Sequence, residues 1–219
     1  MNHIILDLEM NTSPKESGAK NEIIEIGAVM LDDNYTEIGR FETYVCPEHG
    51  EITSIIHELT GITQKDVADA PKFKEAMEDF FKWTDVGECT FYSWSNCDKK
   101  QFEHESELKN YKDARMDKML NNWVDIQVEY DKLVGTGHTV ALGNALKSAN
   151  IELIGKPHTA IGDAINTAEL FKVIRDEKLV QERLGNLIEM FKHKELANSI
   201  LDMFPEMAAY ITEEEVTEE

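Results

Sequence analysis

The chain has 219 residues, 43 of them acidic and 22 of them lysine or arginine, so its formal net charge is −21. A hydrophobic fraction of 42%, with three Trp, nine Phe and six Tyr, excludes a disordered polyanion, and the length suits one compact domain with an appendage. The charge also disfavours a nucleic-acid partner, because proteins that bind phosphate backbones usually present basic surfaces.

Three features of the sequence indicate the cellular compartment of the protein. No apolar run reaches the roughly 18 to 20 residues that cross a bilayer, and the first residues lack the basic segment of a signal peptide. The cysteines, Cys46, Cys89 and Cys97, are odd in number and have no CxxC spacing, so neither a disulfide framework nor a zinc site is indicated. We expect a cytoplasmic protein with reduced thiols and no membrane partner.

The N-terminal part of the chain predicts three strands. Residues 3–10 are rich in branched apolar side chains and suit a buried strand, and the polar stretch 11–18 suits a loop. A second strand is expected at 22–31 and a third at 39–46. The short turn between the last two favours an antiparallel meander.

The rest of the chain is mainly helical in pattern. Apolar residues at helical spacing predict one amphipathic helix at 64–83, and 89–94 is again strand-like. Helical patterns continue over 98–109, 113–133, 142–149 and 163–179. Strands followed by helices and a further strand favour an α/β fold in which helices cover a mixed sheet.

Asp7 and Glu9 have the chemistry of a metal site. Residues i and i+2 of a strand point to the same face, so both carboxylates would leave the 3–10 strand together. Such a pair repels itself unless a cation joins it, and oxygen ligands of this kind suit Mg²⁺ or Mn²⁺. The alternative is a strand end with two solvated acids, since D-x-E is common by chance.

Three further residues could complete such a site. Asp163 could be another metal ligand, and His158 could be a general base for water, because histidine titrates near neutral pH. Asp98 follows the 89–94 strand. Each also has an ordinary interpretation, the two aspartates as helix-capping or first-turn acids and the histidine as a loop residue.

Taken together, the ordered pattern D-x-E, then D, then H-x4-D resembles the DEDD superfamily of 3′→5′ exonucleases, which has a ribonuclease H-like fold. Residues 25–29 (EIGAV) are similar to the second strand of that family, and residues 57–63 (HELTGIT) are similar to its stretch under the substrate's 3′ end. His158, with Thr159 where another branch has tyrosine, resembles the histidine branch, which includes ribonuclease T and DNA polymerase III epsilon-like exonuclease domains.

The resemblance covers residues 3–175. Residues 123–125 and 155–158 are most similar to the subgroup that contains the histone-mRNA 3′-end and RNA-interference-related exonucleases. One departure is Ser95, where the family often has glycine before the second-motif aspartate. We expect an exonuclease domain at 1–175 and, at 176–219, an acidic helical extension and tail with 12 acids and 4 bases.

The resemblance implies a mixed five-stranded sheet that begins with the antiparallel meander and is flanked by helices. It implies that His158 deprotonates the attacking water and that four carboxylates hold two Mg²⁺ or Mn²⁺ ions: Asp7, Glu9, Asp98 and Asp163. It also implies a pocket for the terminal nucleotide, formed by residues whose ordinary interpretation is strand-end and loop packing: Met10, Leu59, Thr60 and Gly61.

The implied substrate is single-stranded nucleic acid with a free 3′ end, RNA being favoured, and the products are nucleoside 5′-monophosphates. Contacts to phosphate require local positive charge, and six cations could supply it or form an ordinary solvated face: Lys99, Lys100, Lys109, Lys112, Arg115 and Lys118. The last three, at spacing three, would share one side of a helix.

Two other functions stay open at the level of sequence. One is a DNA proofreading-type exonuclease subunit whose 176–219 segment docks on a polymerase. The other is a non-catalytic exonuclease-fold module whose acidic extension binds a basic protein partner. Residues 1–175 alone carry a charge of −13, from 31 acids and 18 bases. An enzyme of this charge is expected to attack 3′ ends weakly and distributively.

Overall fold

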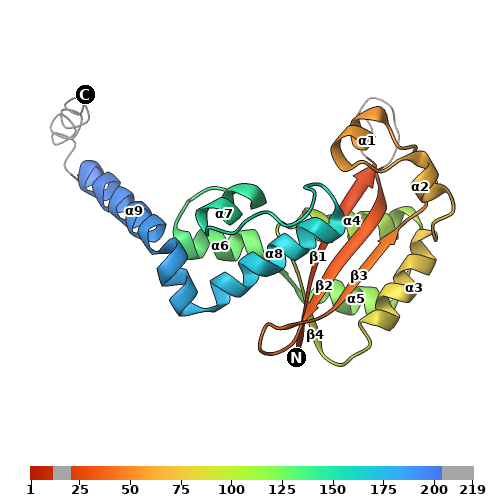
Figure 1. Cartoon of the computed structure of the whole chain (residues 1–219), viewed down its shortest axis with the longest axis horizontal. Coiled ribbons are helices and arrows are strands. Elements are labelled where there is room, and N and C mark those ends of the chain that lie inside the picture. The colour runs from red at the N-terminus through yellow and green to blue at the C-terminus, as the bar shows by residue number, and fades with distance from the viewer. Residues whose placement is uncertain (12–20, 204–219) are drawn as a thin grey trace.

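The computed structural model describes residues 1–11 and 21–203, with the side chains of the last helix described up to residue 193 (Figure 1). A five-stranded sheet has the order β3-β2-β1-β4-β5. Strands β1 (Asn2–Asn11), β2 (Glu22–Leu31) and β3 (Glu37–Tyr44) form an antiparallel meander. Strand β4 (Cys89–Ser93) pairs parallel with β1, and β5 (Trp123–Asp125) pairs parallel with β4. The predicted mixed five-stranded α/β sheet with its leading meander is confirmed.

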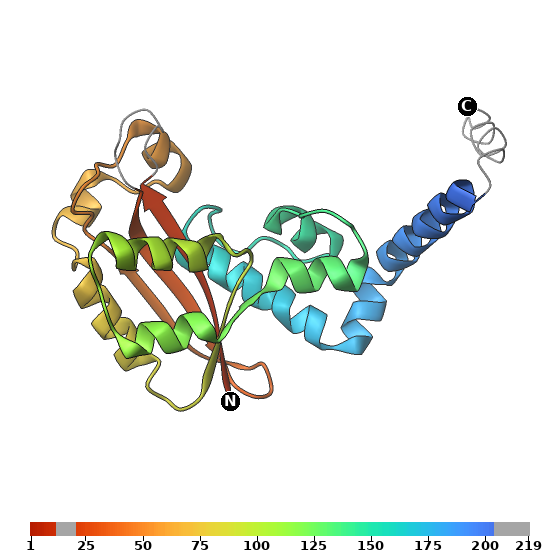
Figure 2. The same cartoon turned by 180° about the vertical axis from the view of Figure 1, so that it is seen from behind.

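Helices cover both faces of this sheet, as the two opposite views show (Figure 1, Figure 2). Their bounds are α1 Ser54–Thr60, α2 Gln64–Ala68, α3 Phe73–Trp83, α4 Cys97–Leu108, α5 Ala114–Asn121, α6 Ile126–Val134, α7 Leu142–Ser148, α8 Ala160–Arg175 and α9 Glu177–Met203. No helix in the described part of the chain combines the length and apolar character needed to cross a membrane.

Strand β1 lies between two hydrophobic cores. Leu6 and Leu8 point into a core shared with α3, α4 and α5, whereas Ile5 points into a core shared with α6, α7 and α8. A strand buried on both faces reads as a continuous apolar run, which explains the pattern of residues 3–10. The alternation also sends Asp7 and Glu9 to the face that α8 covers.

Three of the predicted helices are wrong in extent. The one expected at 163–179 begins earlier and is divided at Asp176 into α8 and α9. The expected helix 64–83 is divided into α2 and α3, because Pro71 lacks an N–H donor and disfavours helical backbone before it. The expected helix 113–133 contains β5, where pairing of Trp123 with Phe91 of β4 overrides the local helical spacing.

Helix α9 begins as part of the packed body and then leaves it. Leu184 is completely buried in the core that α6 and α8 share, and α9 contacts α6, α7 and α8. Beyond this contact, α9 projects away from the body in both views (Figure 1, Figure 2). Residues 204–219, which include the predicted tail, lie outside the described residues. The domain boundary after residue 175 stays a prediction.

A buried ion cluster ties α4 to the start of β2. The Nζ atom of Lys109, just after α4, lies 2.7 Å from Oε1 of Glu105 and 3.1 Å from Oε1 of Glu22. Burial favours the neutral form of Glu22, but the N–H groups of Glu48 and His49 and the Lys109 ammonium together lower its pKa below the ordinary value. The carboxylate of Glu22 therefore also holds the loop at 48–50, whose N–H groups donate to it at 2.7 to 2.8 Å.

Lys109→Met should lower the free energy of unfolding by about 3 kcal/mol, because it leaves two buried carboxylates without their cation. Lys82→Met is the matched control, since Lys82 pairs with Asp79 in solvent and should matter little. Urea denaturation of both variants measures the difference. Equal effects of the two substitutions would contradict a structural role for the buried cluster.

Candidate active site

Asp7 and Glu9 form the floor of a carboxylate cluster on the α8 side of β1. Glu9 is only 9% exposed. Burial raises the pKa of Asp7 well above its ordinary value, and the charges of Asp98 and Asp163 raise it further. Burial, followed by the charge of Glu25, raises the pKa of Glu9 to about 8. The strand thus holds two acids where water stabilises their charges poorly.

Asp98 enters the cluster from the first turn of α4. It is 6% exposed, and its Oδ1 accepts a hydrogen bond of 3.2 Å from the N–H of Leu8 in β1. Burial raises the pKa of Asp98 to about 7, although the Leu8 N–H acts in the opposite direction. This hydrogen bond fixes the start of α4 on the strand that carries Asp7 and Glu9.

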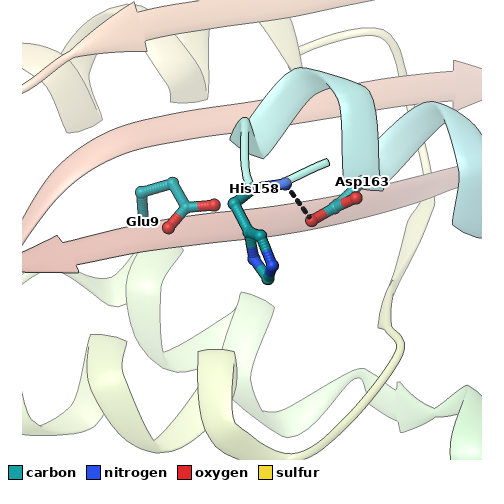
Figure 3. Close-up of side chains that lie close together, drawn as sticks. All are labelled: Glu9, His158 and Asp163. Atoms are coloured by element: carbon teal, nitrogen blue, oxygen red, sulfur yellow. Dashed lines mark hydrogen bonds between the residues drawn. The ribbon is translucent and has the colours of Figure 1, made fainter. Parts of the chain in front are cut away.

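His158 and Asp163 enter from the other side, in the loop before α8 and in α8 itself. One donor atom each from Glu9, His158 and Asp163 lie within 4.8 Å of one another, and the three side chains lie side by side in Figure 3. The N–H of His158 donates to Oδ2 of Asp163 at 3.2 Å. His158 has φ +60°, a left-handed conformation that costs energy in a non-glycine residue, and this hydrogen bond supports it.

The structure therefore brings together all five residues of the predicted cluster: Asp7, Glu9, Asp98, His158 and Asp163. Among the described residues, none of the four acids forms an ion pair with lysine or arginine. Converging carboxylates without a protein cation are the donor set that Mg²⁺ and Mn²⁺ prefer. The residues present fit a divalent metal site.

The expected pocket residues lie around the end of α1. The side chain of Leu59 is 46% exposed, and Gly61 ends α1 with φ +85°, a conformation that favours glycine. Thr60 is buried, and its hydroxyl donates to the carbonyl of Ile56 at 2.9 Å, so it stabilises the turn. Met10, at the end of β1, packs partly against the first core.

The loop that carries His158 is held by residues outside the sequence prediction. Asn166 of α8 is completely buried, accepts a hydrogen bond from Ile154 N–H at 2.8 Å and donates to Ile154 carbonyl at 3.1 Å. Lys156 Nζ donates to the carbonyl of Thr60 at 3.2 Å, which joins this loop to the end of α1. The sequence carried no signal for Asn166, because its burial in a helix that also holds Asp163 and Glu169 depends on tertiary packing.

Glu25 of β2 was also missed as a functional residue. It is 2% exposed and accepts a hydrogen bond of 3.0 Å from the N–H of Ala160, the first residue of α8. An acid within the apolar strand 22–31 was the signal in the sequence, because a buried carboxylate requires a partner.

Two of the candidate phosphate-binding cations are engaged elsewhere. Lys109 is part of the buried ion cluster, and Arg115 pairs with Asp113 at 2.6 Å and Glu78 at 2.7 Å. Lys112 precedes α5, so the expectation that it shares a helical side with Arg115 is wrong. For Lys99, Lys100, Lys112 and Lys118, phosphate contact stays a prediction.

Comparison with known proteins identifies similar chains. The RNase T family model, described as an exonuclease, matches residues 4–171. The chain is 32% identical over 180 residues to ERI1 exoribonuclease 2 of Homo sapiens, covering 71% of this chain and 26% of that protein. It is 25% identical over 185 residues to a probable 3′-5′ exonuclease, KapD, of Bacillus subtilis, covering 82% and 87% of the two chains.

A solved structure has the same fold. The nuclease domain of 3′hExo, a DEDDh family member bound to rAMP, superimposes with a TM-score of 0.71 at 22% identity and covers 84% of this chain and 93% of that chain. The chain spans only about a quarter of the length of the ERI1 exoribonuclease 2 proteins from human, mouse and Xenopus laevis.

In the absence of divalent cations, the protein should be less stable at pH 8 than at pH 5.5. Because folding raises the carboxyl pKa values, the folded state keeps protons that the unfolded state has released, so stability falls as pH rises through this window. The window extends from the ordinary carboxyl range to about 7 for Asp98 and about 8 for Glu9. One such group contributes about 1.4 kcal/mol per pH unit.

Urea unfolding in EDTA at the two pH values measures this loss. Asp7→Asn removes one of the repelling charges and should weaken the pH dependence, whereas Asp117→Asn on the exposed side of α5 should not. A wild-type protein that is equally stable at both pH values would contradict the repulsion.

Proposed function

We propose that the chain, which belongs to the RNase T exonuclease family, works as a member of the histidine branch of the DEDD superfamily and removes nucleotides from the 3′ end of single-stranded RNA. The observation that carries this proposal is the convergence of four carboxylates and one histidine from β1, α4 and the start of α8. The names of the ERI1 exoribonuclease relatives support RNA over DNA.

In this proposal, the carboxylates of Asp7, Glu9, Asp98 and Asp163 hold two Mg²⁺ or Mn²⁺ ions. Two such ions, when bound, neutralise charge on the scissile phosphate, lower the pKa of the attacking water and stabilise the leaving oxygen. The acids are suited to this task because they are held together, partly desolvated, without a competing lysine or arginine among the described residues.

His158 acts as the general base. Its backbone N–H is held by Asp163, and its imidazole makes no hydrogen bond to the described part of the protein, so the ring is available to a water molecule. The ring accepts a proton from the water as the water oxygen bonds to phosphorus. The bond from phosphorus to the 3′ oxygen of the preceding nucleotide then breaks, which releases a nucleoside 5′-monophosphate.

The terminal nucleotide is proposed to lie between the end of α1 and the His158 loop. The exposed side chain of Leu59 offers an apolar surface to a base, and Gly61 leaves the turn without a side chain. Thr60 shapes the pocket through its internal hydrogen bonds, and Met10 would contribute from the end of β1. The negative charge of the chain supports short, distributive encounters with single strands.

We also propose the division into an exonuclease domain at 1–175 and an acidic extension at 176–219. The end of the family match at residue 171 supports this boundary. The packing of Leu184 against α6 and α8 means that the first part of the extension stabilises the domain. A protein partner would bind the extension beyond this contact, and the proposed location is cytoplasmic.

Purified protein should shorten a 3′-extended single-stranded RNA in the presence of Mg²⁺ or Mn²⁺, and EDTA should stop this reaction. His158→Ala should lower kcat by about 10²- to 10⁴-fold, the usual contribution of a general base, while His138→Ala on the surface should leave it unchanged. Asp7→Asn should abolish shortening. Denaturing gels and chromatography of the released nucleotides measure both rate and product.

A DNA of the same sequence completes the test of substrate. Faster degradation of RNA is expected, and faster degradation of DNA would favour the proofreading-type alternative. If the wild type shows no more metal-dependent shortening than Asp7→Asn, the proposal of an enzyme is overturned and the non-catalytic module is favoured.

A further inference from the structure

We propose that Glu25 is a positioning residue that sets the place of α8 on the sheet, and thereby the places of Asp163 and His158. The inference rests on the proposed function, because it concerns how that site is held. Glu25 is not part of the predicted ligand set, and its hydrogen bond is to the backbone of α8 rather than to a site residue.

The first turn of α8 lacks a cap from its own segment. Thr159 occupies the N-cap position but makes no capping hydrogen bond, and its hydroxyl donates instead to the carbonyl of Lys156 at 3.1 Å. The first N–H groups of a helix have no partner within the helix. Oε2 of Glu25 accepts the one from Ala160 at 3.0 Å. A carboxylate also suits the positive end of the helix dipole.

Gly27, two residues along β2, lets α8 lie directly on the strand. A Cβ atom at this position would lie 2.1 Å from the backbone nitrogen of Ile161 and 2.2 Å from the carbonyl carbon of Ala160. No side chain other than hydrogen fits there. Glu25 and Gly27 point to the same face of β2, so one supplies the hydrogen bond and the other the space.

The position of α8 determines two of the five site residues. Asp163 lies one turn after Ala160, and the N–H of His158 is bonded to Asp163. Glu25 is also the cross-strand neighbour of Glu9. Glu25 therefore ties the start of α8 to the β1–β2 pair, and β1 carries Asp7 and Glu9. A displacement of about 1 Å in such an arrangement can cost about 10²-fold in rate.

Three substitutions separate position from charge. Glu25→Gln keeps the length and an acceptor oxygen but removes the charge, whereas Glu25→Asp keeps the charge but withdraws it by one methylene. Glu25→Ala removes both. Glu42 is the matched control, since it lies on the adjacent strand opposite Gly27 and is exposed.

We expect kcat to depend on the hydrogen bond to Ala160 rather than on the charge of Glu25. With a single-stranded RNA, Glu25→Gln should keep kcat within about threefold, while Glu25→Asp and Glu25→Ala should lower kcat by about 10- to 100-fold with little change in KM. The same three changes at Glu42 should have no effect. Calorimetric titration with Mn²⁺ should give Glu25→Gln the wild-type affinity, in contrast to Glu9→Gln.

Three outcomes would overturn the proposal. Wild-type kcat in Glu25→Asp shows that the contact to Ala160 does not position the site, and this variant decides the question if Glu25→Ala does not fold. A loss in Glu25→Gln as large as in Glu25→Asp assigns the effect to charge. A loss of Mn²⁺ affinity in Glu25→Gln as large as that in Glu9→Gln makes Glu25 a ligand. An inactive wild type would instead overturn the proposed function.

Discussion

Four carboxylates meet at the centre of this sheet, and their mutual repulsion is the constraint around which the molecule is arranged. Asp7 and Glu9 share one face of β1, Asp98 approaches from α4, and Asp163 approaches from α8. Burial raises the pKa of all four acids, and the charges of neighbouring cluster acids raise those of Asp7 and Glu9 further. Such a cluster persists only where the elements that carry it are held firmly by other interactions, and two hydrophobic cores flank β1 to provide that support.

Strand β2 provides the anchor points for both helices that bring acids to the cluster. Glu22, at its start, pairs with Lys109 and so holds the far end of α4. Glu25 accepts the first N–H group of α8, which lies directly on Gly27. Two buried glutamates three residues apart thus serve two different helices. These contacts of β2 act together with the hydrogen bond from Leu8 of β1 to Asp98, which holds the start of α4.

The ion pairs near α4 and α5 also engage two cations that could otherwise face a substrate. Lys109 is enclosed by glutamates, and Arg115 is paired with Asp113 and Glu78. In the described part of the protein, two of the six candidate cations near α4 and α5 are therefore engaged in ion pairs within the chain. In the proposed function, acids that would hold divalent ions, rather than a basic surface, suit the site to a phosphodiester.

The sequence by itself was sufficient for the mixed sheet with its meander, because strand patterns are local properties of the chain. It was also sufficient for the family and for the five residues that converge, because their motifs resemble a known family in type and order. It failed where partners are distant in sequence. The strand at Trp123 forms only because β4 offers an edge. The division of 64–83 at Pro71 is a different kind of error, because the proline is a local signal within the predicted helix. The burial of Lys109 and the contact of Glu25 with Ala160, 135 residues away, depend on how helices settle on the sheet. Local spacing cannot specify such contacts, so only the tertiary structure decided how the site is held.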